Sequence, residues 1–496
     1  MDRVARPARF HDYAIIPRAE GEGGAGAPRL LLMRGPQGWT LPRWVHAARH
    51  GRTARELDDP FWPAAIQREL RRQLGLEATV LHAQHFDERD PASGDRRTVF
   101  VMENHSPYWE PPPAARWIGR AELAELPLAT GFLRGAIESW FAEVVAEGQG
   151  AASSSRRPPW QRPGWFEQAM TWAAAQLRRH GLTVTGAAEH LGTKVGRFLM
   201  RLPTGTGAVY FKALPAMYAR EPRLLRLLGA EHPAHLPQLL AADVDRHWHL
   251  TRDHGGTLLT DAAEVSAWER ALGTFGVLQI ACAGRGDALL GAGATDLRLD
   301  VMAAQIQPML EDRAALLLDH PGGLSESELG ALHALVPELR DACQRLAACA
   351  VEPSLVHGDF LPANIAVASG HPVYLDWCEA TVSHPFFSAV RFLASARFHT
   401  RAVREDPVLF TRLRDAYLRP WSGHEPAVRL VEAYELAWQL QPLQYALTYW
   451  HLITQLRSEG LASDAWERRS VAAASLRRLL VQPERLTGVG DGDGGG

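Results

Sequence analysis

Hydrophobic positions in the middle of the chain recur first at helical spacing and then at strand spacing. From Phe166 to Leu177 they recur at intervals of four, three and four residues, which predicts a helix with one apolar face that ends at Gly181. Strand-like runs follow this helix, and a turn with two glycines joins the last two of them. The predicted strands are residues 182–185, 197–202 and 208–214, and the predicted turn is 203–207.

The residues that follow this sheet favour helices. From Ala267 to Ala350 the pattern is mostly helical and rich in alanine and leucine. The pattern therefore predicts a small sheet-bearing lobe followed by a larger helical lobe. This is an α+β arrangement, and ligands preferentially bind in the cleft between two such lobes.

The N-terminal part of the chain carries a separate pattern of strands and one helix. The helix is predicted at 61–74, because Ile66, Leu70 and Leu74 share one face. Together these elements predict an α/β domain. The predicted strands are residues 13–16, 29–33 and 98–102.

The length of the chain, 496 residues, requires more than one hydrophobic core. Single cores stop growing near roughly 250 to 300 residues, and longer chains divide into domains. Residues 148–164 are rich in Ser, Pro, Gly and Arg and lack a hydrophobic period, a composition typical of an extended linker. The predicted division is an N-terminal domain at 1–147, this linker, a second domain at 165–485 and a disordered glycine-rich tail at 486–496.

Composition and charge exclude several classes of protein. The chain has 46% hydrophobic and 22% charged residues, as ordinary folded soluble proteins do, and its formal net charge of −3 predicts no nucleic-acid partner. Its apolar stretches are interrupted before the about 18 residues that indicate a membrane span. The segment Met1–Phe10 lacks the apolar core of a secretory signal, so export is not expected. The composition does not indicate an oligomeric state.

Cysteine usage points to a reducing compartment. The four cysteines form no metal-type pair spacing and are too few for a disulfide framework in so long a chain. We therefore predict that they are packing residues of a cytoplasmic protein. They are Cys282, Cys343, Cys349 and Cys378.

The strongest chemical signal is the segment His357–Asn364, HGDFLPAN, which is followed twelve residues later by Asp376. Phosphoryl transfer to a hydroxyl needs a carboxylate that takes the hydroxyl proton and oxygen ligands for magnesium. An Asp at 359, an Asn five residues later and a second Asp supply this set. The alternative is a plain turn with Asp376 as a capping residue, which accounts for a lone HGD better than for the whole spacing.

A predicted β-hairpin connects these residues. Strand-like residues at 365–367 and 373–375 flank the turn 368–372. The hairpin places Asn364 and Asp376 at adjoining strand ends, where both can reach one ion.

This constellation resembles the aminoglycoside phosphotransferase family and its relatives with a protein-kinase-like fold, whose signature is HGDxxxxN followed by a metal-binding Asp. The resemblance covers about 165–480. It implies a two-lobed protein-kinase-like phosphotransferase with Asp359 as catalytic base and Asn364 and Asp376 as magnesium ligands. It also implies ATP or GTP as the phosphate donor and His357 as a residue that shapes the loop.

The segment Val209–Leu214 matches the family strand whose lysine holds the nucleotide phosphates. Strand alternation sends Val209, Phe211 and Ala213 to one face and Lys212 to the other. Lys212 is therefore the predicted phosphate-binding lysine, and the alternative is a solvent-facing strand lysine.

Glu221 matches the acidic residue of the following helix that pairs with this lysine. Because Pro222 disfavours helical geometry at the residue before it, Glu221 is predicted at the helix start. A role as an N-terminal helix carboxylate competes with the lysine pairing.

Two further segments match the family in order. Trp248–Gly256, which includes Arg252 and His254, resembles the hinge between the lobes, where backbone groups bind the base, so both residues are predicted at the nucleotide site. His190–Gly196 carries two glycines where the backbone could approach phosphates; a plain glycine-bearing hairpin accounts for it equally well. His384, near the start of a predicted helix, is expected to be structural.

The segment Arg68–Leu76 resembles the end of a Nudix box, REUxEExGU, where U is a bulky aliphatic residue. Residues 39–42 resemble the strand before the box, and 117–128 resemble the closing strand and helix. The two adjacent metal-binding glutamates of the box are here Arg72 and Gln73, which cannot replace carboxylates around magnesium. We therefore predict a Nudix-like domain without Nudix hydrolysis; a plain α/β domain is the alternative.

Taken together, these residues predict a magnesium-dependent small-molecule kinase. Family members phosphorylate aminoglycosides, macrolides, choline, homoserine and sugars, and no motif here identifies the acceptor. Two alternatives are open. One is a pseudokinase or nucleotide-binding sensor, which the intact Asp359, Asn364 and Asp376 argue against. The other is a divergent Nudix hydrolase that uses Glu69 with Glu56, Asp58 or Asp59.

Overall fold

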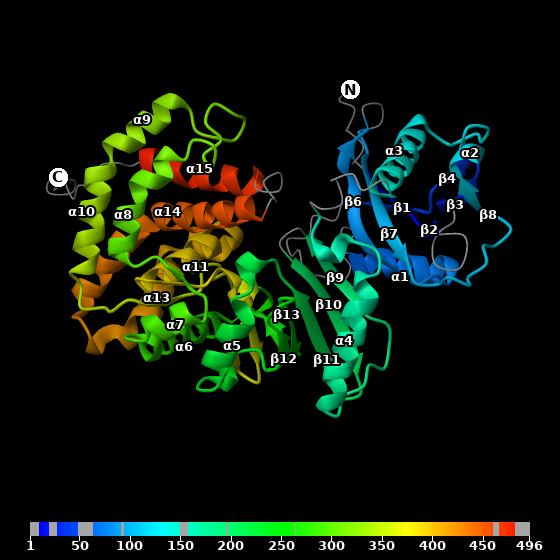
Figure 1. The fold of residues 1–496 in the computed structure, drawn as a ribbon. Coiled ribbons are helices and arrows are strands. Elements are labelled where there is room, and N and C mark those ends of the chain that lie inside the picture. The colour runs from blue at the N-terminus through cyan, green and yellow to red at the C-terminus, as the bar shows by residue number, and fades with distance from the viewer. Residues whose placement is uncertain are drawn as a thin grey trace, which may run out of the picture. The chain divides into compact units, whose positions relative to one another are not determined.

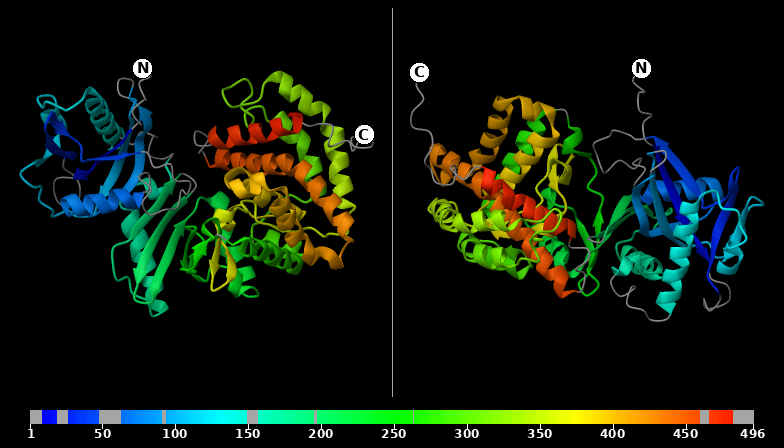
Figure 2. Two further views of the ribbon diagram at one scale, coloured as in Figure 1. Left: turned by 180° about the vertical axis from the view of Figure 1, so that it is seen from behind. Right: turned by 90° about the horizontal axis from the view of Figure 1, so that it is seen from above.

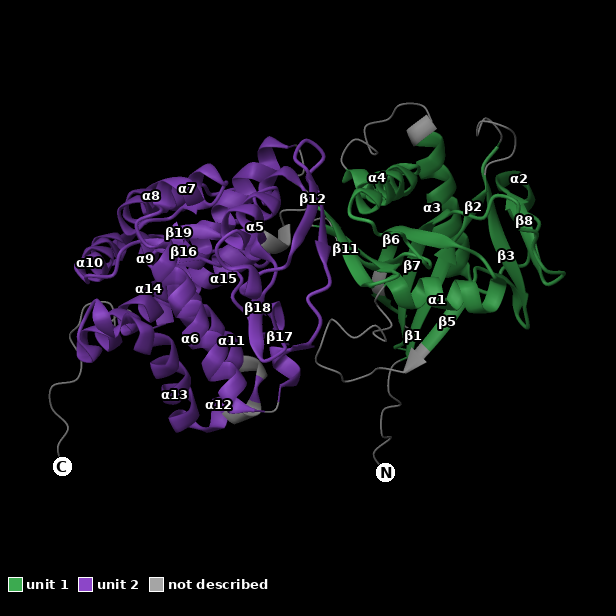
Figure 3. Cartoon of the chain, turned by 90° about the horizontal axis from the view of Figure 1, so that it is seen from below, with its two compact units in different colours: residues 1–213 green, residues 214–496 purple. Residues whose placement is uncertain are grey.

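The computed structural model describes residues 9–18, 27–47, 63–90, 94–148, 157–194, 197–262, 264–459 and 466–481 (Figure 1). The predicted tail 486–496 and the acidic segment with Glu56, Asp58 and Asp59 lie outside these residues. No helix in the described ranges is both long and apolar enough to span a bilayer. The chain divides into two compact units, Met1–Ala213 and Leu214–Gly496 (Figure 3).

Unit 1 begins with two sheets. One has the strand order β5-β1-β7-β6, with β1 parallel to β7, and the other places β3 between β2 and β4 and pairs β8 with β3. The strands are β1 (Arg9–Ile15), β2 (Pro17–Arg18), β3 (Arg29–Gly35), β4 (Gly38–Thr40), β5 (Arg43–Ala47), β6 (Ala78–Arg89), β7 (Arg96–Asn104) and β8 (Ala115–Gly119). The helices of this part are α1 (Pro63–Leu74), α2 (Arg120–Leu123) and α3 (Gly131–Gly148).

Side-chain alternation explains why helices cover both faces of the first sheet. Ala14 and Phe100 pack with Ile66 and Leu70 of α1, as the apolar face of that helix predicts. The next residues along the same strands point the other way and pack against α3. These strand residues include Ile15, Val99 and Val101, and their partners on α3 include Ile137 and Trp140. The α/β character predicted for this part of the chain is therefore present.

The remainder of unit 1 holds an antiparallel sheet and its covering helix. The elements are η2 (Pro159–Gln161), α4 (Trp165–Arg179), β9 (Glu189–Lys194), β10 (Arg197–Thr204) and β11 (Gly207–Ala213), with β10 paired to both other strands. Rings of Trp165 and Trp172 from α4 make edge-to-face contacts with Phe211 of β11, so α4 covers one face of this sheet.

Several predictions for unit 1 need correction. Residues 182–185 form no strand, and only Val184 makes an isolated bridge. Residues 190–194 lie in strand β9, which pairs antiparallel with β10, and both interpretations of this segment stay open. The buried face of α4 consists of Trp165, Ala169, Ala173 and Leu177. The last two are buried as predicted, whereas the first two lie one residue before the predicted Phe166 and Met170, because the tryptophan enters the core.

Unit 2 contains short strands and most of the helices. The strands are β12 (Leu239–Asp243), β13 (Trp248–Arg252), β14 (Thr257–Leu258), β15 (Thr295–Asp296), β16 (Ser354–Val356), β17 (Ile365–Ala368), β18 (His371–Tyr374) and β19 (Thr381–Ser383). The helices are α5 (Glu221–Gly229), α6 (Val265–Cys282), α7 (Gly286–Gly291), α8 (Leu299–Glu311), α9 (Glu326–Ala334), α10 (Val336–Ala347), α11 (Phe386–His399), α12 (Arg401–Glu405), α13 (Pro407–Leu418), α14 (Ala427–Ser458) and α15 (Trp466–Val481).

The core of unit 2 lies between helices and the short strands. Helices α14 and α15 lie side by side, orange and red in Figure 2, and both contribute buried leucines to this core. Phe275 of α6 stacks on Phe360, directly after the predicted catalytic aspartate, at a centroid distance of 4.0 Å. The helical core therefore supports the loop that carries the predicted chemistry. All four cysteines are buried in this unit without a disulfide.

Candidate active site

The loop after β16 is held by a glycine that no other residue can replace without moving the backbone. Gly358 has a φ of +78°, and a Cβ at this position would lie 2.1 Å from the carbonyl oxygen of Glu379. His357 is buried, and its Nε2 lies 2.9 Å from the carbonyl oxygen of Leu375. Burial lowers the pKa of His357 and keeps the ring neutral. The ring therefore donates from Nε2 and shapes the loop that ends in Asp359.

Asp359 and Asn364 are joined directly. Asn364 Nδ2 donates to the main-chain oxygen of Asp359 at 2.8 Å and to its Oδ2 at 2.9 Å. Because the amide nitrogen makes these two bonds, the amide oxygen of Asn364 is the atom that can coordinate a cation. The Asp359 side chain is 29% exposed, so a substrate hydroxyl can reach it.

The predicted hairpin is present and brings Asp376 beside Asn364. Strands β17 and β18 pair antiparallel with Ile365 opposite Tyr374, and the Leu375 N–H donates to the Asn364 carbonyl oxygen at 2.8 Å. Asp376 follows at once with a φ of 67°, a left-handed conformation that aspartate tolerates better than most residues.

The donor set at the end of this hairpin fits magnesium. The Asp376 carboxylate and the Asn364 amide supply hard oxygen ligands, and both come from adjoining strand ends. Magnesium in kinase sites is held by one or two such protein groups together with water and substrate phosphates.

Glu221 is the first residue of α5, as predicted, and its side chain is buried, so the role of an N-terminal helix carboxylate stays open. Its Oε1 accepts from the Trp377 N–H at 3.3 Å, and its Oε2 lies 3.2 Å from Cys378 Sγ. Ligand atoms of Glu221, Asp376 and Cys378 all lie within 4.8 Å of one another. Glu221 therefore links helix α5 to the residues around Asp376.

The hinge-like segment leads into strand β14, which pairs with the β17–β18 hairpin. Strand β14 pairs with β17, with Thr257 opposite Val367. Gly256 has a φ of +80°, and a Cβ there would lie 2.0 Å from the Val367 carbonyl oxygen. At the start of the segment, Arg252 bonds to Gln238 through its backbone N–H and its Nε, and His254 Nδ1 lies 2.5 Å from the Gly255 carbonyl oxygen. The role of Arg252 and His254 at the nucleotide site stays a prediction.

Lys212 is placed as the strand alternation predicts. It is buried in β11 opposite Leu199 of β10, while Val209, Phe211 and Ala213 form the opposite face of the strand. Lys212 belongs to unit 1 and the other predicted site residues to unit 2, so its pairing with Glu221 stays a prediction.

Residues from two helices complete the surroundings of Asp359, and the sequence motifs did not identify them. Arg391 of α11 has its Nη2 3.3 Å from Asp359 Oδ1 and donates to the Tyr445 hydroxyl of α14 at 2.9 Å. The guanidinium also lies over the Tyr445 ring, 4.5 Å from its centroid. The Tyr449 hydroxyl is 3.2 Å from that of Tyr445. Nothing near Arg391 in sequence marks it, since only the packing of α11 turns it toward the loop.

In helix α1, where the sequence resembles the end of a Nudix box, Arg72 and Gln73 stand at the positions of the two metal-binding glutamates. Arg72 Nη2 donates to Glu69 Oε2 at 2.7 Å, and Gln73 Nε2 donates to the same oxygen at 3.1 Å. The one retained carboxylate of the box is therefore paired with the residues that stand where the other glutamates are expected.

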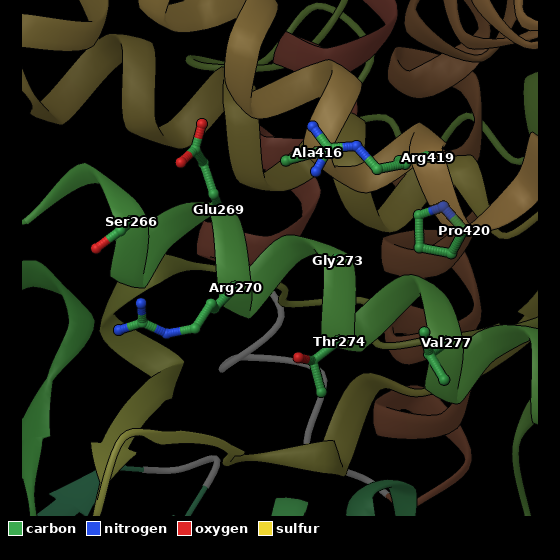
Figure 4. A pocket seen from close by; sticks show the side chains of 9 residues that line it. All are labelled: Ser266, Glu269, Arg270, Gly273, Thr274, Val277, Ala416, Arg419 and Pro420. Carbon is green, nitrogen blue, oxygen red and sulfur yellow. The ribbon is translucent and has the colours of Figure 1, made fainter.

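A surface cavity lies elsewhere in unit 2, between α6 and the residues that follow α13 (Figure 4). None of the predicted site residues lines it. The buried His384 also takes no part in the site, because burial lowers its pKa to about 3 and its ring packs on Phe386.

Comparison with known proteins extends these observations. The model of a family described as "Phosphotransferase enzyme family" matches residues 176–431, just over half of the chain. No curated protein matches the chain.

Three solved structures illustrate what the chain is similar to. A choline/ethanolamine kinase family protein from Mesorhizobium loti is 17% identical over 64% of this chain and 98% of its own, with a TM-score of 0.42. Macrolide 2′-phosphotransferase MphH from Brachybacterium faecium is 17% identical over 62% and 98%, with a TM-score of 0.41. Choline kinase LicA from Streptococcus pneumoniae is 12% identical over 63% and 99%, with a TM-score of 0.41.

Proposed function

Because this chain belongs to the phosphotransferase enzyme family, we propose that it is a small-molecule kinase that transfers the γ-phosphate of ATP or GTP to a hydroxyl group. The observation that carries the proposal is the pair formed by Asp359 and Asn364 at the start of the β17–β18 hairpin. It joins a partly exposed carboxylate to a residue that can bind a cation. This is the arrangement that phosphoryl transfer requires.

In the proposed reaction, Asp359 orients the acceptor hydroxyl and takes its proton. The hydroxyl oxygen forms a bond to the γ-phosphorus while the bond from that phosphorus to the β–γ bridging oxygen breaks. The nucleoside diphosphate leaves. Asn364 and Asp376 would hold the magnesium, which neutralises charge on the phosphates when it is bound.

The remaining predicted residues would bind the nucleotide. Lys212 would contact its phosphates, with Glu221 near the metal residues, and the segment with Arg252 and His254 would meet the base. The contact of Glu221 with Trp377 and Cys378 supports its place at the site. The four buried cysteines, all within the described residues, form no disulfide, which supports a cytoplasmic location.

For residues 1–147 we propose a Nudix-like domain that has lost hydrolysis. The support is the pairing of Glu69 with Arg72 and Gln73, which leaves no cluster of carboxylates in the described part of helix α1. We also retain 148–164 as the connection to a phosphotransferase domain at 165–485, with 486–496 as its tail.

A thermal-shift screen tests the proposal. Binding to the folded state raises apparent stability by mass action, so ATP or GTP with magnesium should raise the melting temperature more than either component alone. Hydroxyl compounds are then screened for nucleotide-dependent phosphate transfer. Nucleotide binding without any transfer or slow hydrolysis would favour a sensor, and release of phosphate from dinucleotides without binding of ATP or GTP would favour a Nudix hydrolase.

A further inference from the structure

One buried amide connects the N-terminal part of unit 1 to the sheet that carries Lys212. Gln67 lies in the middle of α1 and is only 6% exposed. Its Nε2 donates to the Ala78 carbonyl oxygen of β6 at 3.0 Å, and its Oε1 accepts from the His190 N–H of β9 at 2.8 Å. Both polar ends of the side chain are therefore satisfied between two different sheets.

His190 extends this connection along β9. The residue is fully buried, and its Nε2 lies 3.2 Å from the Gly192 carbonyl oxygen. Burial lowers the pKa of His190 to about 3, so the ring is neutral near pH 7. Because a carbonyl only accepts, the ring proton is on Nε2. The ring also packs on Phe198 of β10 at a centroid distance of 4.3 Å.

The strand register leads from Gly192 to Lys212. Gly192 pairs with Leu199, and Leu199 pairs with Lys212. Directly paired residues of antiparallel strands face the same side of the sheet, so Gly192 and Lys212 share a face. Two strand spacings put their backbones about 10 Å apart. The His190 N–H that Gln67 binds therefore lies on β9 two residues before the row that holds Gly192 and Lys212, and a register shift separates the two positions.

A second junction holds the same sheet from its covered face. A Glu103 side-chain oxygen of β7 accepts from the Gly164 N–H at the start of α4, and the rings of His105 and Phe166 lie 4.6 Å apart. Trp165 of α4 packs on the rings of β10 and β11. Both junctions restrict the sheet relative to the N-terminal part of the chain.

We propose that the N-terminal part of this chain braces the nucleotide site, with Gln67 as the positioning residue that sets β9 and, through the strand register, Gly192 and Lys212. The inference rests on the proposed function, in which Lys212 contacts the phosphates of a magnesium–nucleotide complex. The helix that resembles a hydrolase box thus acts as a structural support for phosphate binding by the kinase.

The test uses the full-length chain and the Gln67→Met variant. Methionine has a similar length but makes neither bond, and it leaves the His190 N–H without its acceptor. Without an acceptor for the buried His190 N–H, the ordered position of β9 becomes less favourable. We expect the equilibrium constant for this ordered position to fall roughly tenfold. We expect calorimetry to show about tenfold weaker binding of magnesium–ATP, or of magnesium–GTP if the wild type prefers it. The kcat for phosphate transfer, or for slow hydrolysis, should change less than about twofold at saturating nucleotide.

Two matched variants separate positioning from general destabilisation. Gln67→Glu keeps an acceptor for the His190 N–H and, once its buried carboxyl is protonated, a donor for the Ala78 carbonyl oxygen, so titrations at a pH that protonates it should regain most of the nucleotide affinity. Gln73→Met changes an exposed glutamine of the same helix and should bind nucleotide as the wild type does. If Gln67→Met does not fold, Gln67→Asn takes its place, because the shorter amide cannot reach both partners.

The outcomes distinguish this inference from the proposed function. Wild-type affinity in a folded Gln67→Met or Gln67→Asn protein overturns the bracing role and leaves the kinase proposal intact. Equal losses in Gln67→Glu and Gln67→Met overturn it as well. A wild-type chain that binds no nucleotide overturns the proposed function, and the bracing role with it.

Discussion

Each carboxylate oxygen of Asp359 has its own partner. Oδ2 accepts from the Asn364 amide, and Oδ1 lies 3.3 Å from the guanidinium of Arg391. The two partners come from different directions, one from the same loop and one from helix α11. They fix the plane of the carboxylate without removing it from solvent.

Asp359→Asn should separate catalysis from binding. The neutral amide cannot take a proton, so kcat should fall by about 10² to 10⁴, the usual scale for a positioned general base. Nucleotide Kd should stay nearly unchanged because Asn364 and Asp376 are untouched. The comparison is kcat against nucleotide Kd in wild type and variant; equal kcat values would exclude the catalytic role, and a loss confined to affinity would make Asp359 a metal ligand.

Asp376→Ala should act on the metal instead. Removal of this carboxylate leaves one predicted protein ligand for magnesium, and magnesium-dependent nucleotide affinity should be lost. Calorimetric titrations with and without magnesium measure the effect. Asp415→Ala, which changes an exposed aspartate of α13, is the control. Unchanged magnesium dependence in the Asp376 variant would refute the assignment.

The spacing of the motif was sufficient to predict that Asn364 lies on the same loop as Asp359 and that Asp376 follows the hairpin. It was not sufficient for Arg391 or Cys378. Arg391 reaches the loop only because α11 packs across it, and tertiary packing of this kind leaves no periodic signal near the residue. Glu221 was placed correctly at its helix start, but its partners at 377 and 378 depend on how α5 meets a distant segment.

At the scale of elements, two glycines with nearly the same backbone conformation have different surroundings. Gly256 has a φ of +80°, and a Cβ built on it would lie 2.0 Å from the Val367 carbonyl oxygen. Gly370, in the β17–β18 turn, has a φ of +82° and has no atom within 4 Å of that point. The first joins β14 to β17 by close backbone approach, and the second only turns the chain.

Gly256→Ala and Gly370→Ala should therefore differ in stability. In both variants the left-handed backbone conformation of the new alanine lowers the free energy of unfolding by about 1 to 2 kcal/mol. Gly256→Ala must also move β17, which should bring its loss to about 3 kcal/mol or more and weaken nucleotide binding. Denaturant unfolding monitored by circular dichroism measures both. Similar losses in the two variants would mean that the β14–β17 approach relaxes easily.

At this scale the predictions differ in how far the structure follows them. Helix α1, the β10–β11 hairpin and the β17–β18 hairpin follow their patterns. Residues 182–185 have a strand composition, yet they make one bridge, since a four-residue run gains a strand only if a neighbour pairs with it along its length. At the start of α4, Trp165 enters the core in place of the predicted Phe166, because the larger tryptophan side chain fills more of the core.

At the scale of the whole molecule, the phosphotransferase family predicted from the motifs is confirmed over residues 176–431. The division of the chain was harder to predict. The boundary between the two compact units lies after Ala213, so the β9–β11 sheet belongs to unit 1. Within that unit, the hydrogen bonds of Gln67 and Glu103 link β9 and the start of α4 to the N-terminal part. In the second half of the predicted linker, Trp160 is buried against Trp165. No composition-based signal reports such contacts between sequence-distant segments.

The Nudix-like part should be inactive as a hydrolase in the intact protein. The full-length Asp359→Asn variant removes the proposed kinase chemistry and leaves residues 1–147 unchanged. In the presence of magnesium, it should release no phosphate or mononucleotide from nucleoside diphosphate derivatives. The reason is that Arg72 and Gln73 both donate hydrogen bonds to the Glu69 carboxylate. Chromatography of the reaction mixtures checks this. Robust magnesium-dependent cleavage would restore the hydrolase interpretation.

The placement of the cysteines makes thiol alkylation a reporter of one unit alone. All four thiols are buried in unit 2, and burial raises the pKa of Cys282 and of Cys343 to about 12. Since the thiolate is the reactive form, iodoacetamide should label them only when this unit opens. Tryptophan fluorescence follows both units at the same time. Mass spectrometry of timed labelling should therefore give the opening rate of the catalytic unit in the unmodified protein, and saturating magnesium–nucleotide should slow that rate.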